Sequence, residues 1–366
     1  MSERAYKIRA LTAAGALKAE VTDFLWLGYT RTVGLPGNAT FALPQDHALT
    51  DALVDRDQIE IWRRDPDAGL DWYRDFSGLY LVDRDREQTD VEVATLYAAG
   101  DLIMLSWRYV LWLAGTANRS RFDGVPAETV AKTLVTYNAT AAATTAAGRQ
   151  LFSGAITHPG TISVEADGGG GNAVNWGCSW ANLLDTLHDL AQIAGGDYDL
   201  VKTGANAWEF RWYAGQLGTD RSASVIFSDT YDNLANIRYE ERQSQRVTGV
   251  VVGGPGEGDQ RQLSSAVAAG WSQDSHVEAF LNRTNLKTDA ERQDAGNVEI
   301  YLQRAQRSVS ADVVQTAAVR YGRDYQLGDL VTRNVYGISE TVKIRSVIVA
   351  CDQDGQETIT PEFVVV

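Results

Sequence analysis

Strand-like runs at both ends of the chain, separated by helical patterns in the middle, restrict the fold more than any other feature. Up to about residue 95, and again from residue 224, short runs of β-branched and aromatic residues alternate with turn-forming clusters. The pattern predicts an α+β, β-dominated fold in three parts. These are a β-domain over residues 1–95, a mixed α/β part over 96–215, and a second β-rich part with an inserted helix over 216–366.

The strands expected in the two β-rich parts are short. In the first part they lie at residues 59–62, 78–82 and 90–97, with a turn at 65–69. In the last part they lie at residues 225–227, 234–240, 246–252, 308–320, 330–335, 341–351 and 358–366.

The middle part is expected to contain two helices and a hairpin. Pro126 stands at a first helical position, and apolar residues follow at helical spacing. The clearer helix begins at Ser179 as N-cap and ends at Gly195. Residues 197–202 and 207–213 then form a hairpin. The apolar residues of the two helices are Val130, Leu134 and Tyr137, then Trp180, Leu183, Leu184, Leu187, Leu190, Ala191 and Ala194.

A further helix is predicted near residues 288–307 inside the last part. Thr288 and Glu291 have the spacing of a capping box, in which each side chain bonds the other's backbone N–H. The apolar face of this helix is expected from Val298, Tyr301, Leu302 and Ala305.

Charge and composition exclude several classes of protein. The chain has 33 lysines and arginines against 48 aspartates and glutamates, a net charge of −15, which opposes general nucleic-acid binding. We identify no signal peptide and no membrane-spanning segment, because the long uncharged stretch 133–148 is Thr and Ala. The only two cysteines, Cys178 and Cys351, are expected to be buried thiols.

No catalytic, cofactor-binding or metal-binding constellation emerges from the residues. A serine elbow and a Cys/His signature are missing, and 48 acidic residues nominate no carboxylate pair. The glycine-rich segment 253–259 lacks the Lys-Ser/Thr of a phosphate loop, so we expect a hairpin tip. The histidines, His47, His158, His188 and His276, lack metal-ligand spacing, and His188 is expected to be exposed.

Two groups of aromatic residues leave two interpretations open. Large side chains that fill a core or a subunit interface are the more common explanation, and stacking on sugars is the other. The groups are Trp107, Tyr109 and Trp112, and Trp208, Phe210, Trp212 and Tyr213.

Five stretches, in this order, together resemble the siphophage tail-hub family of ReqiPepy type, which is related to the central baseplate hub of contractile phage tails. They are TRTVGLPGNATFALP, FSGLYLVDRDREQTDVEVATLYAAGDLIMLSWRYV, WANLLDTLHDLAQIAGGDYDLV, VIFSDTYDNLANIRYEERQSQRVTGVVVGG and YGRDYQLGDLVTRNVYGISETVKIRSVIV. The structural residues that match the family's pattern are Gly78, Arg108, Leu183, Leu184, Asn233, Asp324, Gly328 and Asp329.

The resemblance implies a structural protein of the virion, at the tail tip, assembled in the host cytoplasm. It implies two barrel domains like those of the tail tube in each chain, and a homotrimer whose six barrels continue the hexameric tube. Its partners would be distal tail and tube proteins, the tape-measure protein, and tail fibre or tip proteins. DNA would pass the lumen without specific binding, and neither catalysis nor a cofactor is implied.

Alternative functions remain open at this point. A cell-wall hydrolase, or a carbohydrate- or receptor-binding tail protein, would use the aromatic and acidic residues. A bacterial injection device derived from a phage would share the hub role and differ in its host context.

Overall fold

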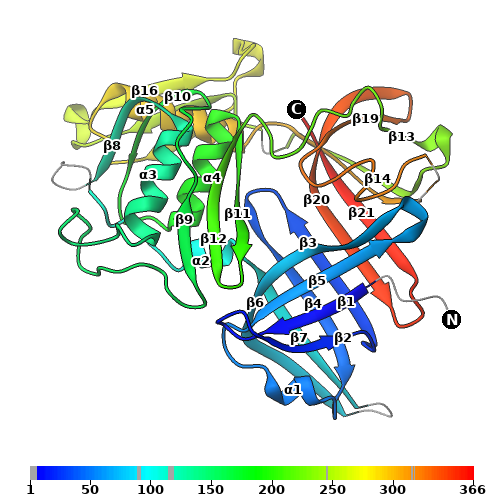
Figure 1. The fold of residues 1–366 in the computed structure, drawn as a ribbon. Helices are drawn as coiled ribbons and strands as arrows, with labels where there is room; N and C mark the ends of the chain where they lie inside the picture. The colour runs from blue at the N-terminus through cyan, green and yellow to red at the C-terminus, as the bar shows by residue number, and fades with distance from the viewer. Residues whose placement is uncertain (1–5, 89–91, 114–118, 245, 315, 317) are drawn as a thin grey trace.

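Two groups of strands, one from each end of the chain, join edge to edge in a single sheet (Figure 1). The structure is a computed structural model, and it describes residues 6–88, 92–113, 119–244, 246–314, 316 and 318–366. A helical part lies beside this sheet. A small three-stranded unit lies next to the helical part, on the side away from the large sheet.

The first group, the N-terminal β-part, contains β1 to β7 and the short helix α1. Its strands run in the order β2-β1-β5-β6-β7-β4-β3. The predicted strands near 59–62, 78–82 and 90–97 are confirmed in β5, β6 and β7, except that residues 90 and 91 lie outside the described residues. The elements are β1 (Tyr6–Leu11), β2 (Leu17–Val21), β3 (Trp26–Thr32), β4 (Leu35–Pro44), α1 (Ala48–Ala52), β5 (Gln58–Asp65), β6 (Leu70–Gln88) and β7 (Glu92–Gly100).

The turn between β5 and β6 follows from its sequence. The 3-10 turn η1 (Pro66–Ala68) fills it, and the Asp65 side chain accepts a hydrogen bond from the Ala68 N–H at 3.1 Å. Gly69 closes it with a φ of 72°, a conformation that suits glycine. The predicted turn at 65–69 is confirmed.

The second group, the C-terminal β-part, contains the remaining strands of the large sheet. Its elements are β13 (Ile226–Ser228), η2 (Asp229–Tyr231), β14 (Leu234–Arg242), β18 (Gln306–Val313), β19 (Leu330–Val335), β20 (Ile338–Asp352) and β21 (Glu357–Val365). The strand predicted at 308–320 was wrong beyond Val313, because the described residues 314, 316 and 318–320 belong to no strand.

Both groups share one open sheet because β3 pairs with β4 on one side and with β20 on the other. Thirteen described strands take part in it. Among the described strands, no pairing closes the sheet on itself within either group, so the two barrels implied by the resemblance are not confirmed. The β-dominated α+β class is confirmed.

The middle part packs helices against a small sheet. Its elements are α2 (Ile103–Ser106), β8 (Ser120–Pro126), α3 (Ala127–Ala139), β9 (Thr161–Val164), β10 (Ala173–Cys178), α4 (Leu183–Ala194), β11 (Gly196–Gly204) and β12 (Ala207–Ala214). Figure 1 shows α3 and α4 next to one another beside β9, β11 and β12. The predicted hairpin is confirmed, since β11 and β12 pair antiparallel along their length.

The start of each helix predicted in the middle part needs a correction. Pro126 is the N-cap of α3 and not its first residue. For α4 the N-cap is Asn182, whose Oδ1 accepts the Leu184 N–H at 3.0 Å, so Ser179 is not the cap. Trp180 lies before the helix and is 52% exposed, while the other six residues of the predicted stripe are buried. The stop at Gly195 is confirmed.

The small unit inserted between β14 and β18 consists of three strands and α5. Its elements are β15 (Gly249–Gly253), η3 (Gly258–Gln260), β16 (Leu263–Val267), η4 (Gln273–Ser275), β17 (Glu278–Asn282) and α5 (Asp289–Leu302). The capping box of Thr288 and Glu291 is confirmed. Segment 253–259 lies in the β15–β16 hairpin connection, so the expected hairpin tip is confirmed.

The predicted apolar face of this helix was wrong. Leu302 is 40% exposed, and Ala305 lies beyond the helix end. The buried residues of α5 are Glu291, Arg292 and Gly296. Gly296 lets the helix approach β16 closely, because an added Cβ would lie 2.8 Å from the Ala266 Cβ. Backbone proximity, and not a stripe of large side chains, therefore sets the orientation of α5.

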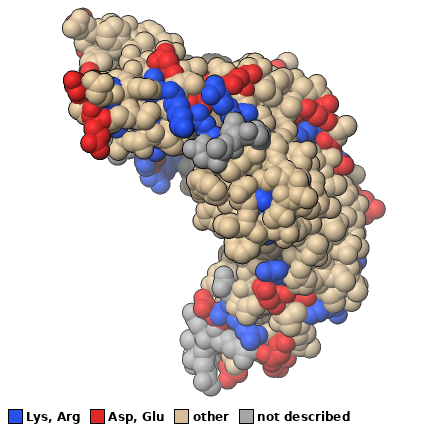
Figure 2. All heavy atoms as spheres, turned by 90° about the vertical axis from the view of Figure 1, so that its left-hand side faces the viewer, with Lys and Arg blue, Asp and Glu red and all other residues tan. Residues whose placement is uncertain are grey.

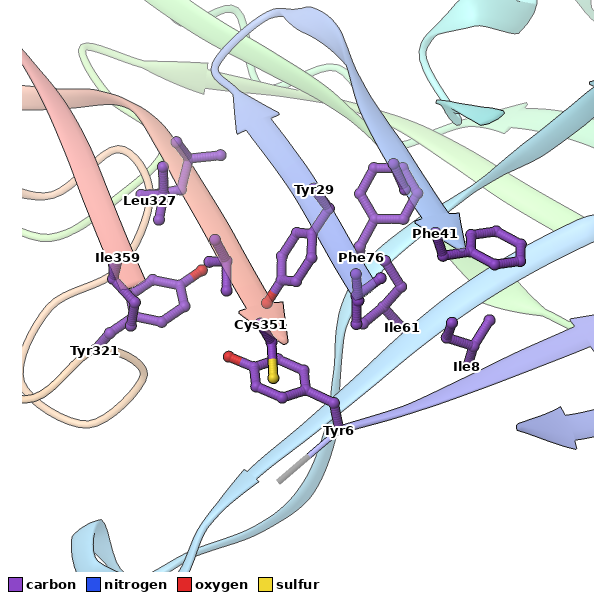
Figure 3. Close-up of a cluster of buried hydrophobic side chains, with 14 of the residues drawn as sticks. Tyr6, Ile8, Tyr29, Phe41, Ile61, Phe76, Tyr321, Leu327, Cys351 and Ile359 are labelled. Carbon is purple, nitrogen blue, oxygen red and sulfur yellow. The ribbon is translucent and has the colours of Figure 1, made fainter. Parts of the chain in front are cut away.

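One hydrophobic core runs through both β-rich parts. Its members include Ile8, Phe41 and Phe76 from the first and Ile344 and Phe363 from the second. Figure 3 shows side chains of both groups facing one another. A separate core fills the middle part around α3, α4 and β12.

Candidate functional site at the junction of the β-rich parts

The junction begins with the pairing of two strands that are far apart in the sequence. Residues Trp26–Thr32 of β3 pair antiparallel with Ser346–Asp352 of β20. The Thr32 and Ser346 hydroxyls are 3.1 Å apart and form a hydrogen bond. This ladder makes the two β-rich parts one continuous structural body.

Arg63 of β5 crosses this junction to Glu357 at the start of β21. Its Nε lies 2.9 Å from Oε2, and its Nη2 lies 2.9 Å from Oε1. The Tyr6 hydroxyl also donates to Oε2, and Tyr73 accepts from Arg63 Nη1 at 3.0 Å. Burial, reinforced by the Glu357 charge, raises the pKa of Tyr6 well above its ordinary value, so Tyr6 remains a donor.

A second buried network surrounds Asp75 of β6. Tyr29 donates to its Oδ2 at 2.5 Å, and Tyr321 donates to its Oδ1 at 2.9 Å. Arg31 donates to Oδ1 at 2.7 Å and supplies the opposite charge. Burial and the Asp75 charge raise the pKa of both Tyr29 and Tyr321 well above the ordinary value.

Figure 3 shows the rings of Tyr6, Tyr29 and Tyr321 turned toward the space between the two groups of strands. The hydroxyls are protonated donors and the carboxylates are occupied acceptors, so the arrangement orders structure and supplies no nucleophile or base. It fixes the angle between the two β-rich parts.

The middle part is attached to both β-rich parts by buried polar contacts. Asp197 of β11 pairs with Lys343 of β20 at 2.5 Å. Tyr198 donates to the Gly34 carbonyl at 2.6 Å, and Lys202 contacts Glu60 of β5 at 2.6 Å. These contacts fasten β11 at three points.

A polar cavity of about 220 Å³ lies where the three parts meet. Charged residues line it on the sides of the N-terminal β-part and the middle part, among them Arg31, Asp101, Asp199 and Lys202, while the C-terminal β-part contributes Leu217 and Leu327. Burial raises the pKa of Asp101 to about 6, although Trp208, Ser77 and Lys202 favour the ionised form. Burial also raises the pKa of Asp199.

The family-matched residues in the first half of the chain occupy packing positions. Gly78 lies in β6 opposite Gly100, and an added Cβ would meet the Ala99 carbonyl at 2.4 Å. The carbonyl of Arg108 accepts the Leu183 N–H at 2.8 Å, so it anchors the start of α4. Leu183 and Leu184 are buried in the core of the middle part.

The remaining family-matched residues organise turns of the C-terminal β-part. Asn233 accepts from the Ser228 N–H and donates to the Ile226 carbonyl, which closes the turn before β14. Asp324 accepts the Arg320 N–H at 2.8 Å. Gly328, with a φ of 86°, precedes Asp329.

Asp329 is the most highly connected of these residues. Its Oδ1 accepts the Thr219 N–H at 2.7 Å, and its Oδ2 accepts the Gln326 N–H at 2.8 Å and contacts Arg221 Nε at 3.0 Å.

Taken together, the eight family-matched residues occupy several separate packing and turn positions. The structure does not bring them together in one site.

The four histidines occupy separate places. His47 caps α1, and the Trp271 Nε1–H donates to His276, whose Nε2 lies 2.8 Å from Glu278. His158 is exposed. His188 is half-buried, which corrects the expected exposure, and it lines a groove of about 860 Å³. Burial and the nearby Arg345 charge lower the pKa of His188.

In the described parts of the chain, no three His, Cys, Asp or Glu side chains gather as a metal ion would need. None of the helices there combines the length and apolar composition required to cross a membrane. Cys178 and Cys351 are buried free thiols, as expected.

The two aromatic groups differ in burial. Trp208, Phe210 and Trp212 are buried, so the core interpretation is confirmed for β12. Trp112 stacks on Tyr137 at a centroid distance of 4.4 Å. Tyr109, by contrast, is 52% exposed.

The residues that join the two β-rich parts were not found from the sequence. Arg63 and Asp75 stand within predicted or adjoining strands, at buried positions where an apolar side chain is usual. A charged residue within a strand-like run indicates that a residue of opposite charge lies beside it in the folded core, because buried charges are normally paired. The partner Glu357 lies 294 positions from Arg63, so no local pattern connects them.

Comparison with solved structures shows a fold of phage tail proteins. A 43 kDa tail protein of prophage MuSo2 from Shewanella oneidensis superposes with a TM-score of 0.61 at 12% identity, over 99% of this chain and 98% of that chain. A tail protein from Neisseria meningitidis gives 0.59 at 10% identity, over 99% and 96%. The prophage tail protein gp18 from Listeria monocytogenes gives 0.51 at 11% identity, over 97% and 94%.

A sequence search of curated proteins found no significant match. A family model, in contrast, matches nearly the whole chain, from residue 7 to residue 363. The match covers both β-rich parts, the middle part and the inserted unit. This chain belongs to the siphovirus ReqiPepy6 Gp37-like protein family.

Proposed function

We propose that this protein is a structural hub protein of the phage tail tip, and that three copies form a ring that ends the tail tube. The observation that carries the proposal is the continuous ladder between β3 and β20. It gives each chain two β-rich parts at a fixed angle, so a trimer offers six β-rich parts to a sixfold tube.

The three-part division at residues 1–95, 96–215 and 216–366 belongs to this proposal. The first and last parts surround the channel of the ring, and the middle part lies farther from its axis. The buried contacts of Asp197, Tyr198 and Lys202 support a rigid attachment between them. A rigid chain suits a ring that must match the spacing of a preformed tube.

The proposed location is the tail tip of the virion, after assembly in the host cytoplasm. The partners are further copies of this chain, distal tail and tube proteins, the tape-measure protein, and tail fibre or tip proteins. DNA passes through the ring without specific binding, which the net charge of −15 supports.

The role proposed here is not enzymatic. The hydrogen-bonded network at the junction is occupied by its own partners, and Asp75 and Glu357 are already paired with arginines. A cell-wall hydrolase remains the rival, and it predicts cleavage of peptidoglycan by the purified chain. Cleavage abolished by one Asp or Glu substitution would decide for the rival.

The ring is tested with the purified full chain. Light scattering should give the mass of three chains, and class averages from negative-stain electron microscopy should show threefold symmetry. A stable monomer at all concentrations, and also at the tip of the intact particle, would contradict the proposed function.

A further inference from the structure

Four large apolar side chains are exposed together on the middle part. They form what we call the aromatic face, which consists of Tyr109, Leu151, Phe152 and Trp180. Their exposed fractions are 52%, 78%, 71% and 52%, respectively. The Trp180 N–H donates to the Val110 carbonyl at 2.9 Å, and the Gln150 N–H donates to the Leu111 carbonyl, so the segments that carry them lie side by side. Exposed apolar side chains gathered in this way are unusual on a monomer and mark interaction surfaces.

The segment that carries Leu151 and Phe152 contains almost no charge. Between Lys132 and Glu165 the only charged residue is Arg149, and it is 3% exposed. Figure 2 views the molecule from the side of this segment and shows a broad area in its middle with very few charged residues. On a chain of net charge −15, such an area resembles the centre of a protein interface, where charged residues are depleted.

Buried Arg149 positions the exposed residues. Its Nη1 donates to the Phe152 carbonyl, and its Nη2 donates to the Tyr109 carbonyl at 3.5 Å. The Gln150 N–H donates to the Leu111 carbonyl at 2.8 Å. The loop with Leu151 and Phe152 is thus fixed against the segment with Tyr109 before any partner arrives, which lowers the entropy lost on binding.

The backbone of the aromatic face is strained at two positions. Leu151 has a φ of 62° and Trp180 a φ of 59°, in the left-handed region that bulky residues disfavour. Both side chains are exposed, so their packing within the chain does not explain the strain. Strain of this kind gathers at binding sites.

A second exposed apolar surface lies on the inserted unit, and we call it the three-stranded face. It consists of Val251, Leu263, Val267 and Phe280. Leu263, Val267 and Phe280 are 58%, 54% and 58% exposed. The strand register places Val251 opposite Phe280, so these side chains share one side of the sheet. Helix α5 covers the other side.

We propose that the aromatic face of one chain packs on the three-stranded face of the next copy in the ring, an inference that rests on the proposed function. A head-to-tail ring needs two different, complementary surfaces on every chain. Both faces expose mainly apolar side chains, and on the three-stranded face Arg261, 5.2 Å from the Phe280 ring, and Glu278 border the apolar residues. In a closed ring, every interface between neighbouring copies then buries one aromatic face and one three-stranded face.

Other occupants fit the aromatic face less well. DNA would need basic side chains, which are missing among its exposed residues. A sugar would use the rings of Tyr109 and Trp180, but it gains little from Leu151, the most exposed member and an aliphatic one. Aliphatic and aromatic side chains together suit the apolar surface of a protein.

Substitutions that introduce opposite charges on the two faces test the proposal with the full chain. Phe152→Glu and Val267→Lys each place an exposed charge in the predicted contact. Each should raise the dissociation constant of the ring about tenfold or more, measured by light scattering over a dilution series. The double variant places opposite charges on the two sides, so assembly should recover, most strongly at about 10 mM salt, where screening is weakest.

Tyr231→Glu is the matched control, because Tyr231 is 61% exposed and lies outside both faces. It should assemble as the wild type does, and circular dichroism should show that all variants are folded. Rings that persist in both single variants overturn this inference and leave the proposed function intact. Monomeric single variants without recovery in the double variant also overturn the pairing of these two faces.

Two further outcomes separate the possibilities. A wild-type chain that never forms a ring overturns the proposed function and this inference together. A Phe152→Glu ring that persists but no longer binds neutral cell-wall polysaccharide would identify the aromatic face as a sugar site, which also overturns the inference.

Discussion

Arg63 and Glu357 form a two-pronged ion pair across the junction of the β-rich parts, with both N–O distances at 2.9 Å. Arg63 is 1% exposed. A buried guanidinium loses its hydration, and the carboxylate together with the tyrosine oxygens replaces it. The pair therefore matters more for the fixed geometry of the junction than for raw stability.

We expect Glu357→Gln to destabilise the protein by about 3 kcal/mol, because it removes the nearest negative charge from buried Arg63 and leaves only Asp65, 3.6 Å away. The free energy of unfolding from urea titration measures this. Asp123→Asn is the control, since Asp123 and Arg121 form an exposed pair at 2.9 Å. Exposed pairs contribute about 0–1 kcal/mol, so equal effects of both substitutions would contradict the prediction.

Asp101 should make the stability depend on pH. Its pKa of about 6 lies above the ordinary value of 3.8, so the folded state retains the proton longer than the unfolded state. The free energy of unfolding therefore falls by about 3 kcal/mol as the pH rises from about 4 to about 6. Above about pH 6 the contribution of Asp101 no longer changes.

Asp101→Asn removes this dependence, because asparagine stays neutral. The variant should match the wild type near pH 4 and exceed it in stability at pH 7. Urea titrations of both proteins at several pH values give the difference, in which the other titrating groups cancel. A difference that does not change between pH 4 and pH 7 would count against a raised pKa.

Local signals were predictable from the sequence, and distant pairings were not. The buried stripe of α4, the β11–β12 hairpin and the Thr288 capping box depend on neighbours a few residues apart. The β3–β20 ladder and the Arg63–Glu357 pair join positions some three hundred residues apart, where a single sequence has no periodicity to report.

The local errors also have physical causes. Trp180 was assigned to α4 from its apolar character, but its left-handed backbone and the cap at Asn182 put it outside the helix. The face of α5 was misjudged because a glycine, Gly296, makes its close contact. Apolar periodicity does not indicate a contact that depends on the lack of a side chain.

Alanine substitutions at Gly328 and Gly337 compare two costs to stability. One is a strained backbone alone, and the other is a strained backbone together with a steric clash. Both glycines have positive φ, at 86° and 76°. An added Cβ at Gly328 would lie 2.8 Å from the Gly218 nitrogen, whereas nothing lies within 4 Å at Gly337. Gly337→Ala should destabilise by about 1 kcal/mol and Gly328→Ala by about 1–2 kcal/mol more, in thermal or urea unfolding. Equal losses of stability in the two variants would show that the chain around Gly218 shifts to accommodate the added methyl group at no cost in free energy.

Asp329→Ala should destabilise the same corner by about 3 kcal/mol. It removes an acceptor for two backbone N–H groups and one arginine, and leaves buried donors unpaired. Asp220→Ala is a suitable control, because Asp220 is exposed and accepts hydrogen bonds from nearby Ser222. A loss no larger than that of the control would contradict the role assigned to Asp329.

Cys178 should be unreactive in the folded protein. Burial raises the pKa of its thiol to about 12, although Trp176 acts in the other direction. Only about one molecule in ten thousand then carries the reactive thiolate at pH 8. A thiol reagent should label it only after unfolding in urea, and rapid labelling of the native chain at Cys178, located by mass spectrometry, would contradict this expectation.

The assembled protein should not retain DNA. Each phosphate contact by a basic side chain releases counterions and adds affinity, so a conduit that carries DNA must avoid such contacts. The chain has 48 acidic against 33 basic residues, and we expect the wall of the ring's channel to be net acidic. Fluorescence anisotropy with labelled duplex DNA at about 50 mM salt, where electrostatic binding is strong, should show no binding by the ring. Tight binding that weakens steeply as salt is added would mean that basic residues line the channel, and would exclude passage without retention.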